Sequence, residues 1–324
     1  MPGFDSAAKE KLARELKAEA RRLGFDLCGL AEAKPLDDEA RHLEQWLAEG
    51  RHAGMDWMAN HFDLRTDPTK LVPGARTVVC LVHSYWQGTP ADPAASGPAV
   101  GRVARYAWGD DYHEVLKGKL AELFDWLDRR AGGIAGRVFV DSGPVLEKAW
   151  AQRAGLGWAG KNANLLNPRL GSYFFLAEMI VDVPLPPDAP FAADHCGSCT
   201  RCIDACPTDA IYRPGAVDAN RCISYWTIEH RGPTFPEDLA RDFGGWVFGC
   251  DVCQEVCPWT KFSRPTSDAR FLARDGIATT PLAEWAELDI EAFRERFRRN
   301  PVKRAKYDGL MRNVASALGR ASDE

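Results

Sequence analysis

The chain of 324 residues lacks any long hydrophobic run. Its longest strongly apolar stretch, residues 173–183, is interrupted by Glu178 and is too short to cross a bilayer. Residues 1–24 form a charged amphipathic helix pattern without the apolar core of a signal peptide. Because 45% of the residues are hydrophobic and the net charge is -5, we expect a soluble, cytoplasmic protein that does not enter a membrane.

A complete Walker signature is missing as well. The glycine-rich segment 155–164 has Asn162 where a Walker loop requires Ser or Thr. Nucleotide hydrolysis is therefore disfavoured. The glycine backbone can still approach a cofactor closely, and Lys161 could meet a phosphate or a carboxamide.

What the chain does contain is cysteine in a ferredoxin spacing. The pattern C-x2-C-x2-C-x3-C-P is formed by Cys196, Cys199, Cys202, Cys206 and Pro207. In a two-cluster ferredoxin the fourth cysteine of such a run binds the other cluster, so a second run is required. It is present but incomplete, with Val247 at the first position, followed by Cys250, Cys253 and Cys257.

Cys222, between the two runs, is the cysteine that we expect to replace the missing ligand. The cross-over rule then predicts two ligand sets for two [4Fe–4S] clusters. The first set is Cys196, Cys199, Cys202 and Cys257, and the second is Cys206, Cys222, Cys250 and Cys253. Disulfides or structural zinc are the alternatives, but zinc has no use for the C-x3-C-P ending, and disulfides do not persist in a reducing cytosol. Cys28 and Cys80 lie in apolar stretches and receive no role.

The cluster segment needs only about residues 194–260, so other domains are expected. Helical patterns at 7–23, 37–49, 112–130 and 145–154 alternate with strand-like runs at 26–30, 77–83, 137–140 and 173–183. This alternation predicts an α/β domain over residues 1–187, with a surface loop at 88–101. A cluster domain at 188–262 and a helical segment at 263–324 follow.

Asp141 stands at the end of a hydrophobic strand-like run. Residues at strand ends in α/β folds commonly face the ligand crevice, which makes Asp141 a candidate general acid. The alternative is that Asp141 or Ser142 only caps a helix starting near Pro144. A second segment, residues 105–113, is dense in aromatic and titratable groups, and its plain interpretation is a loop with an Asp helix cap and a packed aromatic pair.

A basic run lies near the C-terminus and contains only one acid, Glu295. Its seven basic residues are Arg294, Arg296, Arg298, Arg299, Lys303, Arg304 and Lys306. The pattern predicts a basic helix that is either a phosphate-binding face or merely a solvated surface.

Together these features resemble one family, the cobalamin-dependent epoxyqueuosine reductases, which act last in making the tRNA nucleoside queuosine. The resemblance spans most of the chain. It depends on the order and combination of the eight cysteines with segments 71–76 (LVPGAR), 105–106 (RY), 111–113 (DYH), 140–144 (VDSGP), 154–157 (AGLG), 160–162 (GKN), 222–225 (CISY), 227–229 (TIE) and 248–251 (FGCD).

The resemblance implies a base-off cobalamin held between a nitroreductase-like α/β or α+β domain and the ferredoxin module. No D-x-H-x-x-G run is present, so a histidine ligand to cobalt is not expected. Electrons would pass through the clusters to cobalt, which acts on the epoxide, while the family's proton donor falls on Asp141. Used as an acid near neutral pH, Asp141 would need a raised pKa.

By the same resemblance the cobalamin would be contacted by Arg65, Tyr106, Asp141, Lys161, Asn162, Cys250 and Asp251. The substrate is a tRNA with a GUN anticodon, whose wobble base would be splayed from a single-stranded loop. Residues 224–231 would face it, with Ser224, Tyr225, Glu229 and Arg231 as contacts, and Arg298, Arg299 and Lys303 would meet its backbone.

Longer family members end in helical repeats that grip tRNA, and this chain stops soon after residues 311–315, where such a repeat would begin. We therefore expect residues 263–324 to form a truncated tRNA-binding repeat, in a monomer served by an unidentified electron donor. Three rival functions remain open. They are a reductive dehalogenase, although such proteins carry twin-arginine leaders that are missing here, a pure electron-transfer protein, and an RNA-binding protein with structural clusters.

Overall fold

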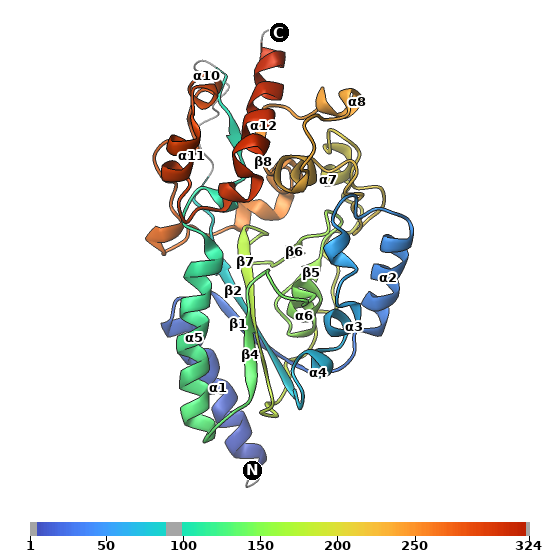
Figure 1. Ribbon diagram of the computed structural model, residues 1–324. Helices are drawn as coiled ribbons and strands as arrows, with labels where there is room; N and C mark the ends of the chain where they lie inside the picture. Colours follow the sequence, from blue (N-terminus) through green and yellow to red (C-terminus); the bar gives the residue numbers. More distant parts are fainter. Residues whose placement is uncertain (1–4, 89–98, 322–324) are drawn as a thin grey trace.

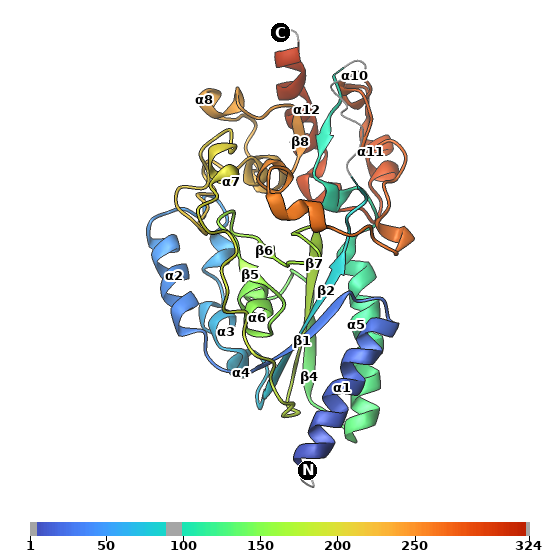
Figure 2. The same ribbon diagram turned by 180° about the vertical axis from the view of Figure 1, so that it is seen from behind.

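The structure is a computed structural model that describes residues 5–88 and 99–321. Most of the surface loop predicted at 88–101 lies outside these residues. The N-terminal helix and the C-terminal helices lie at opposite ends of the molecule (Figures 1 and 2). Within the described part of the chain, no helix combines the length and the apolar character that crossing a bilayer requires.

A four-stranded sheet forms the centre of the N-terminal half. Its strands are β1 (Leu27–Glu32), β2 (Thr77–Ser84), β7 (Phe174–Val181) and β4 (Gly136–Phe139), in the order β1-β2-β7-β4. All four strand-like runs are therefore confirmed, within a few residues of the expected bounds. Every neighbouring pair is antiparallel. The argument from strand ends in α/β folds therefore does not apply to Asp141, and this layer is α+β, one of the two classes that the resemblance implies.

Helices cover both faces of this sheet (Figure 1). One face carries α1 (Ser6–Arg22) and α5 (Tyr112–Ala131). The other carries α6 (Glu147–Arg153), with α2 (Asp37–Ala48), η1 (Asp56–Met58), α3 (Phe62–Thr66) and α4 (Pro68–Leu71) beyond it. β2 is buried along its whole length, and its alternate residues join the apolar cores on the two faces of the sheet. Each fully buried aliphatic side chain contributes about 1.5–3 kcal/mol to folding.

The structure excludes the alternative in which Asp141 or Ser142 caps the helix that follows. Helix α6 begins at Glu147, two residues later than expected, and neither Asp141 nor Ser142 caps it, since its N-cap residue is Leu146 without a side-chain bond. Asp111 does cap α5, accepting from the His113 backbone N–H at 3.1 Å. The aromatic pair expected in that segment also forms, with Tyr106 and Tyr112 edge to face at 6.1 Å.

The cluster segment is built from short elements joined by loops. They are α7 (Arg201–Asp204), the single π-helical turn η4 (Tyr225–Glu229), α8 (Glu237–Ala240), β8 (Trp246–Phe248), α9 (Val252–Glu255) and η5 (Pro258–Phe262). Two links join this segment to the first half. In the first, β8 pairs in parallel with β3 (Arg102–Val103), which lies just before η3 (Arg105–Ala107). The second is the hairpin of β5 (Trp158–Ala159) and β6 (Leu165–Leu166), which reaches toward the cluster segment.

The basic run is not one helix, contrary to prediction. The C-terminal elements are η6 (Ala269–Phe271), α10 (Leu282–Ala286), α11 (Ile290–Arg296), η7 (Pro301–Ala305) and α12 (Lys306–Ala321). The chain turns at Arg299, whose φ is 56°, and Asn300 caps η7. These elements share one apolar core with β8, in which Phe248, Trp285 and Leu310 are fully buried. The division at residue 262 stays a prediction.

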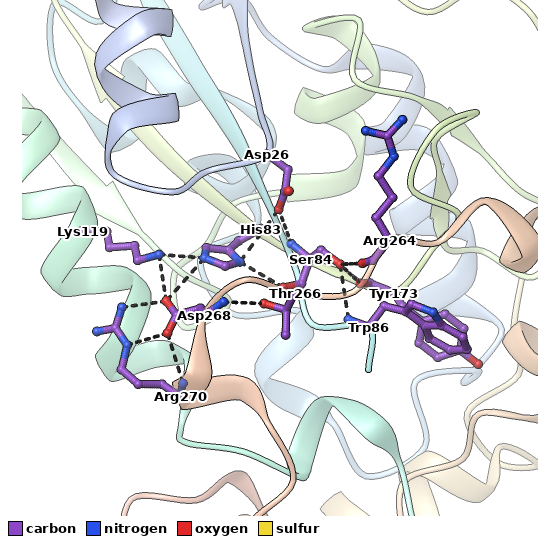
Figure 3. A network of polar contacts seen from close by, with 10 residues as sticks. All are labelled: Asp26, His83, Ser84, Trp86, Lys119, Tyr173, Arg264, Thr266, Asp268 and Arg270. Atoms are coloured by element: carbon purple, nitrogen blue, oxygen red, sulfur yellow. Dashed lines mark hydrogen bonds and ion pairs between the residues drawn. The ribbon is translucent and has the colours of Figure 1, made fainter. Parts of the chain in front are cut away.

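A polar network fastens the segment before η6 to the sheet (Figure 3). Buried His83 on β2 accepts from Lys119 Nζ on α5 at 2.7 Å. Lys119 also contacts Asp268 at 2.9 Å, and Asp268 accepts from Arg270 Nη2 at 2.7 Å. Burial and the Lys119 charge lower the pKa of His83, so its ring is neutral and Nδ1–H donates to Ser84 O. We call these four residues, His83, Lys119, Asp268 and Arg270, the His83 cluster.

Candidate functional site

The first predicted cysteine set lines one cavity of about 360 Å³. It contains Cys196, Cys199, Cys202 and Cys257. Lys161, at the tip of the β5–β6 hairpin, donates to the carbonyls of Gly197 at 2.6 Å and Cys199 at 3.0 Å, which orders the loop between two of the cysteines. Lys161 thus lies beside the first cysteine set.

The second set lines a separate cavity of about 460 Å³. It contains Cys206, Cys222, Cys250 and Cys253. Cys222 directly precedes the helical residues before η4, and Gly249 (φ 68°) lets the chain turn into Cys250. A Cβ at Gly249 would stand 2.5 Å from the Ala104 Cβ, so the close approach of these two segments requires glycine. The two cavities therefore divide the eight cysteines as the cross-over rule predicts.

The state of the cysteines fits iron–sulfur ligands. All ten are free thiols. Among residues 5–88 and 99–321, no three His, Cys, Asp or Glu side chains converge closely enough to hold a single metal ion. The four ligands of a cubane bind four different iron atoms, so they stand farther apart than the ligands of one zinc ion.

A third cavity, of about 610 Å³, adjoins the second cysteine set. Tyr106, Asp141 and Glu147 line it, and Cys222 lines both cavities. The other residues common to both are Tyr85, Tyr106, Lys148, Phe174, Leu176, Val217, Ser224 and Ile228. A candidate acid and a candidate cluster thus face one connected, largely apolar space. We call the third cavity, on the side of Asp141, the acid cavity.

Asp141 lies in the turn after β4 with a left-handed φ of 54°. Its Oδ2 accepts from the Tyr112 hydroxyl at 2.5 Å and faces His113 Nε2 at 3.5 Å. Its backbone N–H donates to Glu147 Oε1 at 2.5 Å. The side chain is 60% accessible because it opens onto the acid cavity.

The protonation pattern differs from the one that the sequence argument required. Desolvation by the surrounding protein raises the pKa of Asp141, but the hydrogen bonds from His113 and Tyr112 outweigh it and leave that pKa below its usual value. Burial alone would lower the pKa of His113, yet Asp111 and Asp141 raise it to about 9. Near neutral pH the mobile proton of this pair therefore resides on His113, with Asp141 as its neighbour on the cavity side.

Of the predicted cofactor contacts, most surround the second cysteine set. Tyr106 and Cys250 line its cavity, Asn162 donates to Cys253 O at 3.3 Å, and Asp251 is 1% exposed. Burial raises the pKa of Asp251 to about 6, while Arg105 binds it through N at 2.8 Å and Nη1 at 3.2 Å. Arg65 is different: it is buried against Trp57 O at 3.4 Å and lines none of these three cavities.

Of the predicted tRNA contacts, Ser224, Tyr225 and Glu229 line the acid cavity. Tyr225 Oη accepts from Gly54 N at 3.0 Å, and Glu229 is held by Arg304 at 2.8 Å, so both have partners already.

The predicted basic contacts are exposed around the same part of the molecule. Arg299 pairs with Glu114 at 2.6 Å, next to His113 on α5. The positive charge of Lys303 helps to lower the pKa of Asp111. Arg231 donates to Arg304 O at 3.1 Å, and Arg298 is exposed on the turn before η7.

Sequence reasoning missed several residues of the acid cavity. Glu147, Lys148, Met55 and Trp57 all line it, and Trp57 is 44% exposed. Nothing in the spacing pointed to the loop at 51–58, because tertiary contacts such as Ala219 N to Arg51 O bring it there. Tyr112 and His113 stood in a segment that the sequence singled out, but without a role.

Comparison with known proteins points to one family. Residues 65–142 match the family model described as "Epoxyqueuosine reductase QueG, DUF1730", and residues 195–260 match "4Fe-4S double cluster binding domain". The chain is 47% identical to the epoxyqueuosine reductase of Cyclobacterium marinum, over 97% of this chain and 99% of that protein. It is 44% identical to the epoxyqueuosine reductase of Pseudomonas aeruginosa, over 96% and 86%.

The fold agrees with that likeness. A crystal structure of epoxyqueuosine reductase with a tRNA-Tyr epoxyqueuosine-modified stem loop superposes with a TM-score of 0.90 at 32% identity, over 97% of this chain and 83% of that chain.

Proposed function

Since the chain belongs to the epoxyqueuosine reductase family, we propose that it reduces epoxyqueuosine to queuosine at the wobble position of tRNA. The observation that carries this proposal is the arrangement of Asp141, Tyr112 and His113 in a cavity that continues to the second cysteine set. A proton-bearing pair beside an electron carrier is what removal of an epoxide oxygen needs.

The two cysteine sets are proposed to hold two [4Fe–4S] clusters. The match of residues 195–260 to a double-cluster domain supports this, as does the grouping of the thiols around two cavities. Clusters of this type transfer single electrons, so the first set would pass electrons to the second. Lys161 and Asn162 lie where the two sets approach each other, because Asn162 lines both cavities.

The connected space between the second cysteine set and Asp141 suits a base-off cobalamin. Its walls include the aromatic and aliphatic side chains of Tyr85, Tyr106, Phe174 and Leu176. Among the residues that the structure describes, no histidine lines either cavity, which suits a cobalt without a histidine ligand. When bound there, cobalamin would supply the electrons that open the epoxide.

The protein's own residues then manage protons. Converting the epoxide to an alkene takes two electrons and two protons and releases one water. His113 holds a proton near neutral pH, and Asp141 lies between it and the cavity, so Asp141 would take that proton and pass it to the departing oxygen. The Tyr112 hydroxyl, donating at 2.5 Å, keeps the Asp141 carboxyl facing the cavity.

The substrate base is proposed to enter the acid cavity past Trp57. An exposed indole at a cavity that admits a splayed base offers a stacking surface. Ser224, Tyr225 and Glu229 would line its path, and Arg298, Arg299 and Lys303 would contact the phosphates.

The test is anaerobic incubation with epoxyqueuosine-bearing tRNA and a chemical reductant, with and without cobalamin, followed by nucleoside mass spectrometry. Conversion to queuosine only when cobalamin is present is expected. No conversion by protein with both clusters intact, in an assay where a known reductase converts the same tRNA, would contradict the proposal and favour simple electron transfer.

A further inference from the structure

A buried carboxyl lies behind the candidate acid without a role so far. Glu178, in the middle of β7, is 0% exposed, and among the described residues neither of its carboxyl oxygens meets a hydrogen-bond donor. Its register neighbours are Cys80 on β2 and Phe139 on β4, both buried in the apolar core on the α6 side. An ionised carboxylate is strongly disfavoured in these surroundings, and burial raises the pKa of Glu178 well above its usual value.

Helix α6 packs against β7, and this contact brings Glu147 within hydrogen-bond reach of Glu178. Two ionised carboxylates offer each other no donor, which leaves both Glu178 oxygens without a partner. Once Glu178 carries a proton, its O–H can donate to the Glu147 carboxylate. Burial and then the Asp141 charge raise the pKa of Glu147 itself to about 7. The surroundings of both carboxyls therefore favour a single proton shared between Glu147 and Glu178.

Glu147 in turn holds the turn that carries Asp141. Its Oε1 accepts the Asp141 backbone N–H at 2.5 Å. Asp141 has a φ of 54°, a conformation that costs energy for a residue with a Cβ and therefore needs a contact to maintain it. The three acids thus form a chain from the core of the sheet to the cavity. We call Asp141, Glu147 and Glu178 the acid cluster.

We propose that Glu147 is a positioning residue, whose carboxylate holds the Asp141 turn so that the Asp141 side chain faces Tyr112 and His113, and that Glu178 keeps Glu147 in place by donating their shared proton. The consequence for turnover rests on the proposed function, whereas the consequence for the turn itself does not. Titratable groups act on Glu147 from five directions: Asp141 after β4, Glu178 on β7, His113 on α5, Lys148 on α6 and Cys80 on β2.

The first measurement is amide hydrogen exchange of the peptide spanning residues 139–146, on the protein with its cofactors bound. In Glu147→Ala the Asp141 amide loses its acceptor, and its exchange is expected to be at least about fivefold faster. In Glu147→Gln the amide oxygen can still accept the N–H, so protection should return. Glu122→Ala, an exposed glutamate on α5, is the matched control and should exchange like the parent protein.

The second measurement separates positioning from a general loss of structure. Glu147→Ala is expected to lower kcat by about 10- to 100-fold while KM for the tRNA stays within about twofold, because the acid is displaced while the tRNA contacts remain. Glu147→Gln should recover part of kcat. Should Glu147→Ala fail to fold, Glu178→Leu serves instead, since it frees Glu147 from its donor, with Glu178→Gln as the variant that keeps a donor.

Unchanged exchange at Asp141 in Glu147→Ala, or equal loss of kcat in the Ala and Gln variants, would overturn the proposal. The two failures are distinguishable. If the parent protein does not convert epoxyqueuosine, the proposed function fails, yet the exchange measurement still decides whether Glu147 holds the turn.

Discussion

The two polar clusters lie on opposite faces of the same sheet, and their charges are arranged in opposite ways. The His83 cluster packs with Phe25 and Phe271 on the α1 and α5 side, and its single acid, Asp268, is matched by Lys119 and Arg270. The acid cluster lies on the α6 side and places three carboxyls in a row. A satisfied buried network holds structure together, whereas carboxyls held close with shifted pKa values mark chemistry.

Asp268 of the His83 cluster and Glu147 of the acid cluster affect stability with opposite signs. Hydrogen bonds, first from Arg270, lower the pKa of Asp268, so its contribution to stability is present above the ordinary carboxyl pKa and is lost as the pH falls. Burial raises the pKa of Glu147 to about 7, so stability present below its ordinary pKa is lost as the pH rises toward 7. Glu147 is therefore kept at a cost to folding near pH 7, as expected of a residue in a functional site.

The largest effect should come from removing the electron path beside the acid cluster. Cys222→Ala is expected to lose about four of eight irons and essentially all turnover, because Cys222 belongs to the proposed second set. Iron analysis and nucleoside mass spectrometry measure the two losses. Cys28→Ala is the control, since Cys28 packs against the apolar core, and iron retained in Cys222→Ala would refute the ligand assignment.

Asp141→Asn tests the acid itself. An amide can keep the bond from Tyr112 but cannot pass a proton from His113, so turnover should fall by about 1000-fold. Iron and cobalamin content should stay unchanged, which separates chemistry from assembly. Asp125→Asn, on the exposed side of α5, is the control. Turnover within about threefold of the parent enzyme would remove Asp141 from the mechanism.

The pH dependence tests which residue of the pair stores the proton. Because the pKa of His113 is raised to about 9, turnover should be level below that pH and fall about tenfold per unit above it. Asp111→Asn removes the negative charge beside the ring but keeps an oxygen acceptor and a good helix cap, so the falling limb should move to lower pH. A limb that stays in place would mean that another group supplies the proton.

The smallest effect on turnover is expected from a substitution in the His83 cluster, on the opposite face of the sheet. Asp268→Asn should cost about 1–3 kcal/mol of folding free energy near pH 7, because it weakens a part-buried network, and this difference should shrink in acid. Chemical denaturation at pH 7 and pH 4 measures it. Turnover reduced as strongly as in Asp141→Asn would break the contrast between the two clusters.

Much of the fold could be predicted because its signals are local. Apolar runs located all four strands of the sheet, and helical spacing located α1, α2 and α5 within two residues. The break in the basic run was missed, since only the fold shows that Arg299 turns and that Asn300 binds the carbonyls of Ala107 and Gly109. The antiparallel strand order was missed for the same reason, because pairing depends on segments far apart in the chain.

The candidate site, too, could be predicted only in part from the sequence. Cysteine spacing, read with the cross-over rule of two-cluster ferredoxins, predicted two sets of four. The family resemblance placed the acid at Asp141. Only the tertiary structure brought His113 from α5, Glu147 from α6 and Glu178 from β7 to that turn. The protonation states of these side chains depend on this arrangement. Burial and neighbouring charges shift their pKa values, and both depend on residues that are distant in sequence.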